Sequence, residues 1–374
     1  MGRGRRLKVA VVAPSLRILG GQSVQADRLL RAWTDDPDVE ARLVPVNPEP
    51  PAWLRFARDI KYLRTVINEL TYVPRLVREL ARADIVHVFS ASYASYLLAP
   101  LPAMLIGRAL GKPVILNYRS GEAPDHLSRS AVARKTIAGV DRNIVPSQFL
   151  VDVFATFGID ASVIPNIVDL DRFAFRERVP LRPRLVSTRN FDDLYNVACT
   201  IRAFRLVQDR RPDATLTLVG GGPQDRELRA LGARLGVSHV EFIGRVNPDQ
   251  IAGCYAANDI YVQTPNIDNM PTSVLEAFAS GLPVVSTEAG GVPAILTHGE
   301  HGLLAPLDDH EQVAAHILRL LDDQPYANRL VRAGVARVQS CTWSNVREQW
   351  LSAYRSVLRE SPPEPVARPA LQPK

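Results

Sequence analysis

The sequence is poor in cysteine and lacks any long run of apolar residues. Its three cysteines, Cys199, Cys254 and Cys341, are odd in number and form no Cys-x-x-Cys pair. We therefore expect reduced thiols that serve in packing, and neither a disulfide framework nor a cysteine-bound metal. No stretch of about 18 or more uncharged apolar residues occurs, so no helix is expected to span a bilayer.

The N-terminal residues do not match a secretion or lipidation signal. Residues 1–6 are basic, but the apolar run after them, from Val9 to Pro14, is too short for a signal sequence. Arg6 stands where a myristoylation signal requires Ser or Thr. We expect a cytoplasmic protein. At 374 residues and 46% hydrophobic content, the chain should form two folded domains.

The net charge of +6 is partly local. Between Trp53 and Arg82, seven basic residues stand against three acidic ones, interleaved with aromatic and aliphatic residues. Such a segment suits a helix that lies on an anionic membrane, at the inner face of the plasma membrane in a cytoplasmic protein. An ordinary solvated face is the commoner explanation. No nucleic-acid partner is expected, because no base-reading motif accompanies the charge.

Two segments share the same order of elements, an apolar strand, a loop and an amphipathic helix. They begin at residues 7–14 and 184–188. Further short runs rich in Val and Ile indicate buried strands at residues 85–89, 113–117, 143–146, 215–219, 240–243, 259–263 and 283–286. Short buried strands between helical patterns predict an α/β chain with parallel sheets covered on both faces. We expect two Rossmann-like, doubly wound lobes that face each other across a cleft.

Prolines and charges interrupt these patterns near residues 164–184, and the residues after 360 are rich in proline. The expected domains are an N-terminal lobe at 1–165, a linker at 166–183, a C-terminal lobe at 184–342, a closing helix at 343–360 and a disordered tail at 361–374.

The most informative loop covers residues 266–277, directly after a predicted strand. Ligands of open α/β sheets bind beyond the carboxyl ends of the strands. Pro271 suits the first turn of a helix, and the free N–H groups of such a turn suit a diphosphate. Asp268 and Glu276 would repel that anion, whereas they fit the hydroxyl donors of a sugar and a ribose.

This loop also carries a family resemblance. An acid, seven residues and a Glu-Ala pair, from Asp268 to Ala277, resemble the motif of the family 4 (group 1) retaining glycosyltransferases, with Asp268 replacing the usual first Glu. Residues 275–287 and 290–293 also look like this family. The resemblance implies a GT-B fold, with an acceptor-side N-terminal lobe, a donor-side C-terminal lobe and a closing helix that returns to the first lobe.

The resemblance implies roles for this loop. Glu276 would hold the ribose hydroxyls of a nucleotide diphosphate sugar, and Asp268 would hold the donor sugar. The amides that follow Asp268 would assist, in the segment Asn269, Met270 and Pro271.

Arg189 matches the arginine with which the family neutralises the leaving diphosphate. Together with Asp268 and Glu276 it completes the expected catalytic set. Tyr195 stands where the family usually has a lysine, so one charge is missing, and Arg245 is a candidate to compensate.

Other loops would complete the donor site. By resemblance, Gly244, Arg245 and Val246 would lie along the nucleotide base. Gly20 and Gly21 would let the backbone approach the donor phosphates and the acceptor, through close approach or a positive φ.

Arg119 stands where many family members carry a histidine that contacts the donor sugar. It either substitutes as a polar contact or marks a different acceptor preference. We expect His126 to be solvated rather than to replace that histidine.

The implied reaction transfers a hexosyl unit from a nucleotide diphosphate sugar to a hydroxyl, with retention of the anomeric configuration. Sugars, lipid-linked sugars and glycolipids of the cell envelope are the expected acceptors. No metal or other cofactor is expected, because arginine and helix N-termini replace it and no Asp-x-Asp follows a strand. Because the lysine is missing, a catalytically weak or inactive nucleotide-sugar-binding partner of a polysaccharide assembly complex stays open as an alternative. A sugar-nucleotide epimerase also stays open, because the same two-lobed fold hosts such enzymes.

Overall fold

A computed structural model describes residues 5–17, 20–48 and 61–359, and for residues 61–67 and 359 it describes the backbone alone. The predicted tail at 361–374 and the first part of the basic stretch, residues 53–60, lie outside the described residues. In the described part, no helix is long and apolar enough to cross a membrane.

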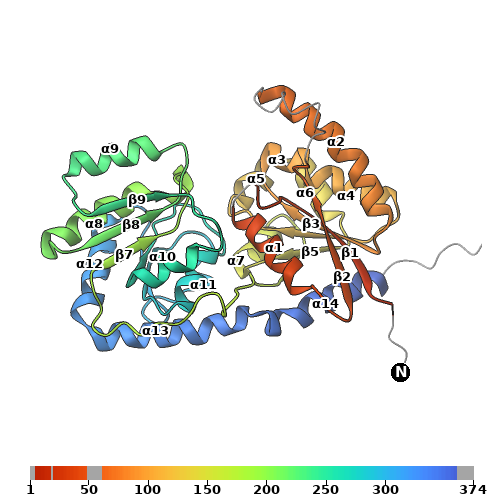
Figure 1. The fold of residues 1–374 in the computed structure, drawn as a ribbon. Coiled ribbons are helices and arrows are strands. Elements are labelled where there is room, and N and C mark those ends of the chain that lie inside the picture. The colour runs from red at the N-terminus through yellow and green to blue at the C-terminus, as the bar shows by residue number, and fades with distance from the viewer. Residues whose placement is uncertain (1–4, 18–19, 49–60, 360–374) are drawn as a thin grey trace, which may run out of the picture.

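The chain forms two lobes, each built on a six-stranded parallel sheet (Figure 1). The first sheet has the order β2-β1-β3-β4-β5-β6. Its strands are β1 (Leu7–Ala13), β2 (Val39–Pro45), β3 (Ile85–Ser90), β4 (Val114–Tyr118), β5 (Arg142–Val145) and β6 (Ser162–Val163). The second sheet has the order β12-β11-β10-β7-β8-β9. Its strands are β7 (Arg184–Ser187), β8 (Thr215–Val219), β9 (Val240–Gly244), β10 (Ile260–Val262), β11 (Val284–Thr287) and β12 (Leu303–Ala305). The predicted doubly wound α/β architecture is confirmed.

Helices cover both faces of each sheet (Figure 1). Those of the first lobe are α1 (Gly21–Ala32), α2 (Lys61–Ala81), α3 (Tyr93–Leu98), α4 (Pro100–Ala109), α5 (Ala123–Arg129), α6 (Ala131–Ala138) and α7 (Gln148–Ala155). The second lobe has α8 (Val197–Arg210), α9 (Asp225–Leu235), α10 (Ile251–Ala257), α11 (Thr272–Ala279), α12 (His310–Asp322) and α13 (Gln324–Val338). Short 3-10 turns lie at η2 (Asp193–Tyr195), η3 (Val292–Ala294) and η4 (Gln339–Cys341).

Strand β1 shows why a continuous apolar run is needed here. Alternate side chains of a strand point to opposite faces. Val9 and Val11 therefore enter one apolar core, while Ala10 and Val12 enter the core on the other face. Because both faces are dry, the strand has no polar alternation.

The closing helix α14 (Trp343–Arg359) returns from the second lobe and packs on the first (Figure 1). Trp350 and Tyr354 join the core that contains β1, and Trp33 of the loop after α1 meets Trp343 edge to face at 4.6 Å. The expected return of this helix to the first lobe is confirmed.

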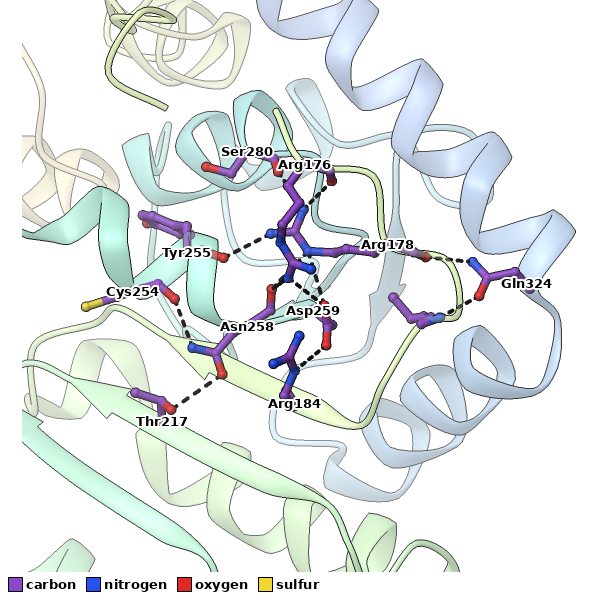
Figure 2. Close-up of polar contacts among 11 residues, drawn as sticks. Arg176, Arg178, Arg184, Thr217, Cys254, Tyr255, Asn258, Asp259, Ser280 and Gln324 are labelled. Atoms are coloured by element: carbon purple, nitrogen blue, oxygen red, sulfur yellow. Dashed lines mark hydrogen bonds and ion pairs between the residues drawn. The ribbon is translucent and has the colours of Figure 1, made fainter. Parts of the chain in front are cut away.

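The segment between β6 and β7 is fastened to the second lobe by arginines. Figure 2 shows Arg176, Arg178 and Arg184 gathered around Asp259. Arg176 donates to Asp259 Oδ1 at 2.7 Å, and Arg184 donates to Oδ2 at 2.5 Å. The charges that interrupt periodicity in the sequence therefore anchor this segment.

Arg178 also closes the ends of two helices. Its guanidinium donates to the carbonyls of Tyr255 at 3.0 Å and Asn258 at 2.9 Å, at the end of α10, and of Ser280 at 2.6 Å, after α11 (Figure 2). Carbonyls at a helix C-terminus lack helical donors and attract cations. Arg178 thus fixes two helices that contribute side chains to the cleft.

Candidate active site

A cavity of about 650 Å³ lies between the carboxyl ends of the two sheets and is lined by both lobes. It gathers eleven of the twelve residues expected in the catalytic set and the donor site: Gly20, Gly21, Arg119, Arg189, Arg245, Val246, Asp268, Asn269, Met270, Pro271 and Glu276. The remaining one, Gly244, ends β9 and is not among the lining residues.

Arg189 and Asp268 form a nearly buried ion pair in this cavity. Arg189 Nη2 donates to Asp268 Oδ2 at 2.6 Å, and Nη1 donates to Ser273 Oγ at 3.1 Å. Burial alone would lower the pKa of Arg189, but the charge of Asp268 and the neighbouring tyrosines Tyr195, Tyr261 and Tyr255 together outweigh burial and raise it. Arg189 is therefore a permanent cation held at the start of α11.

Tyr195, at the position of the family's lysine, stacks under Arg189. The guanidinium carbon lies 4.0 Å from the centroid of the Tyr195 ring, a cation-π distance. Burial raises the pKa of Tyr195, so its phenol stays neutral. The side chain supports Arg189 but brings no positive charge of its own.

Glycines let the loops of the site approach each other. A Cβ added at Gly220 would lie 2.0 Å from the Arg189 carbonyl oxygen, and one added at Gly222 would lie 2.4 Å from the Phe191 carbonyl oxygen. The Gly220–Gly222 run therefore supports the Arg189 loop.

A second glycine pair supports the Asp268 loop. A Cβ added at Gly290 would lie 2.2 Å from the Asp268 carbonyl oxygen, and one added at Gly291 would lie 2.1 Å from the Asn269 carbonyl oxygen. The amide of Asn269 donates to Asp268 Oδ1 at 2.8 Å, which fixes the carboxylate. The family-like Gly290-Gly291 pair thus shapes the loop that carries the expected donor contacts.

Glu276 accepts hydrogen bonds from both lobes. Arg28 of α1 donates from Nη2 to Glu276 Oε1 at 2.6 Å, and Tyr255 donates to Oε2 at 2.9 Å. The Arg28 and Glu276 side chains are only 7% and 10% exposed. Arg28 lines the cavity and was missed from the sequence, where it is one of several polar residues of an amphipathic helix.

Other contacts join α1 and the loop before β7 to the segment 268–272 of the second lobe. Gln25 donates from Nε2 to Thr272 Oγ1 at 3.3 Å and to the Ile167 carbonyl at 2.9 Å. Asn166 donates to the Met270 carbonyl at 2.7 Å. The segment 268–272 is thus held by both lobes.

The first glycine loop has no positive φ among its described residues, Gly20 and Gly21. Gly20 has φ −175°, Gly21 begins α1, and an added Cβ at either would meet nothing within 4 Å. Neither a positive φ nor close packing against protein requires glycine here. Both residues nevertheless line the cavity.

Arg119 follows β4 and enters a buried polar chain. Its Nη1 donates to Asn117 Oδ1 at 3.0 Å, and Asn117 Nδ2 lies 3.0 Å from His87 Nε2. His87 Nδ1 lies 2.9 Å from the hydroxyl of Tyr354 on α14.

The expectation for His126 was wrong: this side chain is 1% exposed and its Nδ1 lies 2.9 Å from the Tyr118 hydroxyl. Apolar and aromatic neighbours cover it, which neighbouring sequence did not indicate.

Arg245 and Val246 line the cavity beside the second-lobe glycines. Arg245 Nη2 donates to the Gly221 carbonyl at 3.3 Å. Gly244 has φ +81°, the left-handed region that favours glycine, and its carbonyl accepts from the Gly220 amide at 2.9 Å. Gly244 therefore shapes the turn that presents its two neighbours.

The site combines a fixed guanidinium, a helix N-terminus and two carboxylates across one cleft. The arginine and the first turn of α11 can stabilise a diphosphate, and the carboxylates can accept hydroxyl hydrogen bonds. Among the residues that the structure describes, no group of three or more His, Cys, Asp or Glu side chains could hold a metal ion.

Comparison with known families agrees with this geometry. Residues 9–172 match the family described as Glycosyltransferase Family 4, and residues 173–337 match Glycosyl transferases group 1. The structure is similar to the crystal structure of Anabaena HepE in complex with UDP-glucose, with a TM-score of 0.76 and 18% identity, over 94% of this chain and 100% of that one. That likeness confirms the GT-B fold.

Two curated relatives come from Mycobacterium tuberculosis. The chain is 33% identical over 211 residues to a phosphatidyl-myo-inositol mannosyltransferase, covering 54% of this chain and 55% of the relative. The chain thus spans about half the length of this relative. It is 32% identical over 289 residues to a GDP-mannose-dependent alpha-(1-6)-phosphatidylinositol monomannoside mannosyltransferase, covering 70% of this chain and 73% of that protein. The chain belongs to the family 4, or group 1, glycosyltransferases.

Proposed function

We propose that the chain transfers a hexosyl unit from a nucleotide diphosphate sugar to a hydroxyl acceptor with retention of the anomeric configuration. The observation that carries this proposal is the convergence, in one two-lobed cavity, of Arg189, the N-terminus of α11 and the carboxylates of Asp268 and Glu276. Two lobes that close on one cavity suit a two-substrate reaction.

Each group has a chemical role in this proposal. Arg189 and the first-turn amides of α11 stabilise the departing diphosphate. Asp268 orients the donor sugar, and Glu276, fixed by Arg28 and Tyr255, accepts the ribose hydroxyls. No metal takes part in the proposed reaction.

The reaction breaks the bond between the anomeric carbon and the diphosphate oxygen, and forms a bond from the same carbon to the acceptor oxygen. The acceptor hydroxyl proton passes to the departing diphosphate. The protein positions both substrates and stabilises the charge that develops on the leaving group.

An assay of released nucleoside diphosphate tests this function, with a panel of nucleotide sugars and hydroxyl acceptors. We expect release that depends on both substrates, and nuclear magnetic resonance of the product should show the anomeric configuration of the donor. Inversion would contradict the proposed stereochemistry, and product formation without an acceptor, with the sugar changed in place, would favour an epimerase.

Tyr195 favours a second candidate, a nucleotide-sugar-binding partner of a polysaccharide assembly complex without transfer activity. The site lacks the lysine ammonium and holds a neutral phenol in its place. Tight binding of a nucleotide sugar with no release of nucleotide across the whole acceptor panel would support this candidate.

We further propose a lipid-linked or glycolipid acceptor and a peripheral contact with an anionic membrane, at the cytoplasmic inner face of the plasma membrane. Helix α2 exposes Leu70 (69%), Val73 (37%) and Val77 (42%), and Arg75 and Arg78 are exposed beside them. Apolar side chains interleaved with arginine suit an interfacial helix. The names of the mycobacterial relatives include a phosphatidylinositol lipid.

Flotation with vesicles that contain anionic lipid tests the membrane contact. At low salt we expect the chain to float, and Arg75→Gln with Arg78→Gln should weaken association by about 2 kcal/mol, at about 1 kcal/mol for each basic residue. Leu307→Gln is a control, because Leu307 is 49% exposed on the second lobe. Failure of the wild-type chain to float would contradict the contact.

A further inference from the structure

Arg119 is held in the active-site cavity by a rigid support. It lies just after β4, and Gly121, two residues on, approaches the Asp268 loop so closely that an added Cβ would lie 3.0 Å from the Asp268 carbonyl carbon. Its guanidinium carbon lies 5.4 Å from the centroid of the Phe89 ring. The series of side-chain contacts from Arg119 to Asn117, His87 and Tyr354 of α14 holds the guanidinium in place.

The charge of Arg119 is not neutralised by the protein. Arg28 and Arg189, which line the same cavity, each form an ion pair with a carboxylate. Within the described residues, Arg119 has no such ion pair, and its hydrogen-bond partner Asn117 is neutral. Its Nη2 is buried and has no hydrogen-bond partner in the described part of the chain.

A buried guanidinium nitrogen without an acceptor is costly, and an anion that supplies the acceptor removes that cost. Burial lowers the pKa of Arg119 to about 9, which still leaves the group charged at neutral pH. Glu122 also lines the cavity, but its Oε2 is 3.5 Å from the Ser120 hydroxyl and makes no ion pair with Arg119 among the residues described.

We propose that Arg119 binds a negatively charged substituent of a substrate, a carboxylate, sulfonate or phosphate on the transferred sugar or on the acceptor. This inference rests on the proposed function and narrows its substrate class. A guanidinium with one nitrogen, Nη2, left without a partner suits an oxygen of such a group. A neutral histidine at this position would lack that charge.

Isothermal titration calorimetry with matched ligands tests the proposal in two arms. The first compares donors that differ only in a sugar carboxylate, UDP-glucuronate against UDP-glucose and GDP-mannuronate against GDP-mannose, with UDP and GDP alone as references. The second compares glucuronate and glucose 6-phosphate against glucose, without nucleotide and with saturating UDP or GDP. The proteins are the wild type, Arg119→Gln, Arg119→Lys and Arg129→Gln.

In at least one arm, the wild type should bind the charged ligand roughly tenfold or more tightly than its neutral match, the scale of one charged hydrogen bond. Arg119→Gln should remove this preference and Arg119→Lys should retain part of it. Arg129→Gln is the control for the general charge of the protein, because Arg129 is 75% exposed in the same lobe, and it should keep the preference. Preference in the first arm assigns the anion to the donor, and in the second arm to the acceptor.

The proposal is overturned if neither arm shows a preference, or if the preference survives in Arg119→Gln. If UDP and GDP fail to bind, the proposed function fails instead, and the nucleotide-free titrations alone decide the role of Arg119. Melting temperatures of the ligand-free variants identify any that have not folded.

Discussion

Arg28 of α1 donates to Glu276 of α11 at 2.6 Å, so a buried ion pair joins the two lobes at the carboxylate expected to hold the donor ribose. Arg28 also donates to the Ile167 carbonyl at 3.1 Å, in the segment between β6 and β7. The same arginine therefore ties three parts of the chain together and orients Glu276.

Arg28→Gln should lower the free energy of unfolding by about 3 kcal/mol, because removal of one partner leaves a buried charge without compensation. Glu276→Gln in the same chain should restore part of that loss, since it removes the stranded charge. Denaturant unfolding of the wild type, both single variants and the double variant measures the coupling. Additive losses would show that the two groups do not depend on each other.

Glu276→Gln should weaken the binding of a nucleoside diphosphate by about 1.5 to 3 kcal/mol, the scale of a hydrogen bond to a charged group. The cause is the loss of a carboxylate that accepts the ribose hydroxyls. Calorimetric titration measures the change, with Glu227→Gln as a control because Glu227 is exposed on α9 of the same lobe. Equal affinity of the Glu276→Gln variant and the wild type would remove Glu276 from the site.

Arg189→Gln should reduce kcat by about 10² to 10³, as expected when a preorganised donor to a developing charge is lost. The affinity for the acceptor should change less than kcat, because the guanidinium acts mainly on the leaving diphosphate of the donor. Nucleotide release measures kcat, and Arg202→Gln is the matched control, on α8 with a side chain 40% exposed. A rate within twofold of wild type would exclude Arg189 from catalysis.

Stability should fall as the pH drops below about 6.5, in part because of His87. Burial first, and then the charge of Arg119, lower the pKa of His87 to about 3 in the folded chain. In the unfolded chain His87 binds a proton as the pH falls through about 6.5, whereas in the folded chain it stays neutral there. Low pH therefore favours unfolding. Between about pH 6 and pH 4, His87 alone should lower the free energy of unfolding by about 1.4 kcal/mol for each unit by which the pH falls.

The variant His87→Gln isolates this contribution. Gln can still reach the groups that face His87, the Asn117 amide and the Tyr354 hydroxyl, but it does not titrate. Unfolding free energies at several pH values should show a shallower slope for the variant. Equal slopes would mean that the pKa of His87 is the same in the folded and the unfolded chain.

Much of the fold follows from local pattern. The central strands, such as β1 and β11, are continuous Val-rich runs because both faces of each sheet are buried. The three strands that were not predicted, β2, β6 and β12, lie at sheet edges. Strand β2 carries Glu40 and Arg42, and β6 has only two residues, so neither shows the apolar run of a central strand.

The candidate site could be predicted only where its residues are close in sequence. Asp268 and Glu276 share one loop and helix, so spacing finds them together. Arg28 lies 248 residues from Glu276, and only the packing of α1 against the second lobe makes it a partner. His126 is buried by aromatic rings that come from Tyr93, Tyr96 and Tyr118, and its own neighbours Asp125 and Ser128 gave no sign of this.

Hydrogen exchange with and without a bound nucleotide tests most directly whether the two-lobed cavity is the donor site. The ligand is whichever nucleoside diphosphate raises the melting temperature most, because binding to the folded state stabilises it. Slower exchange should appear at residues 188–195, 244–246 and 266–276 of the second lobe. Protection that is confined to other regions, or no binding by any nucleoside diphosphate, would contradict the central claim.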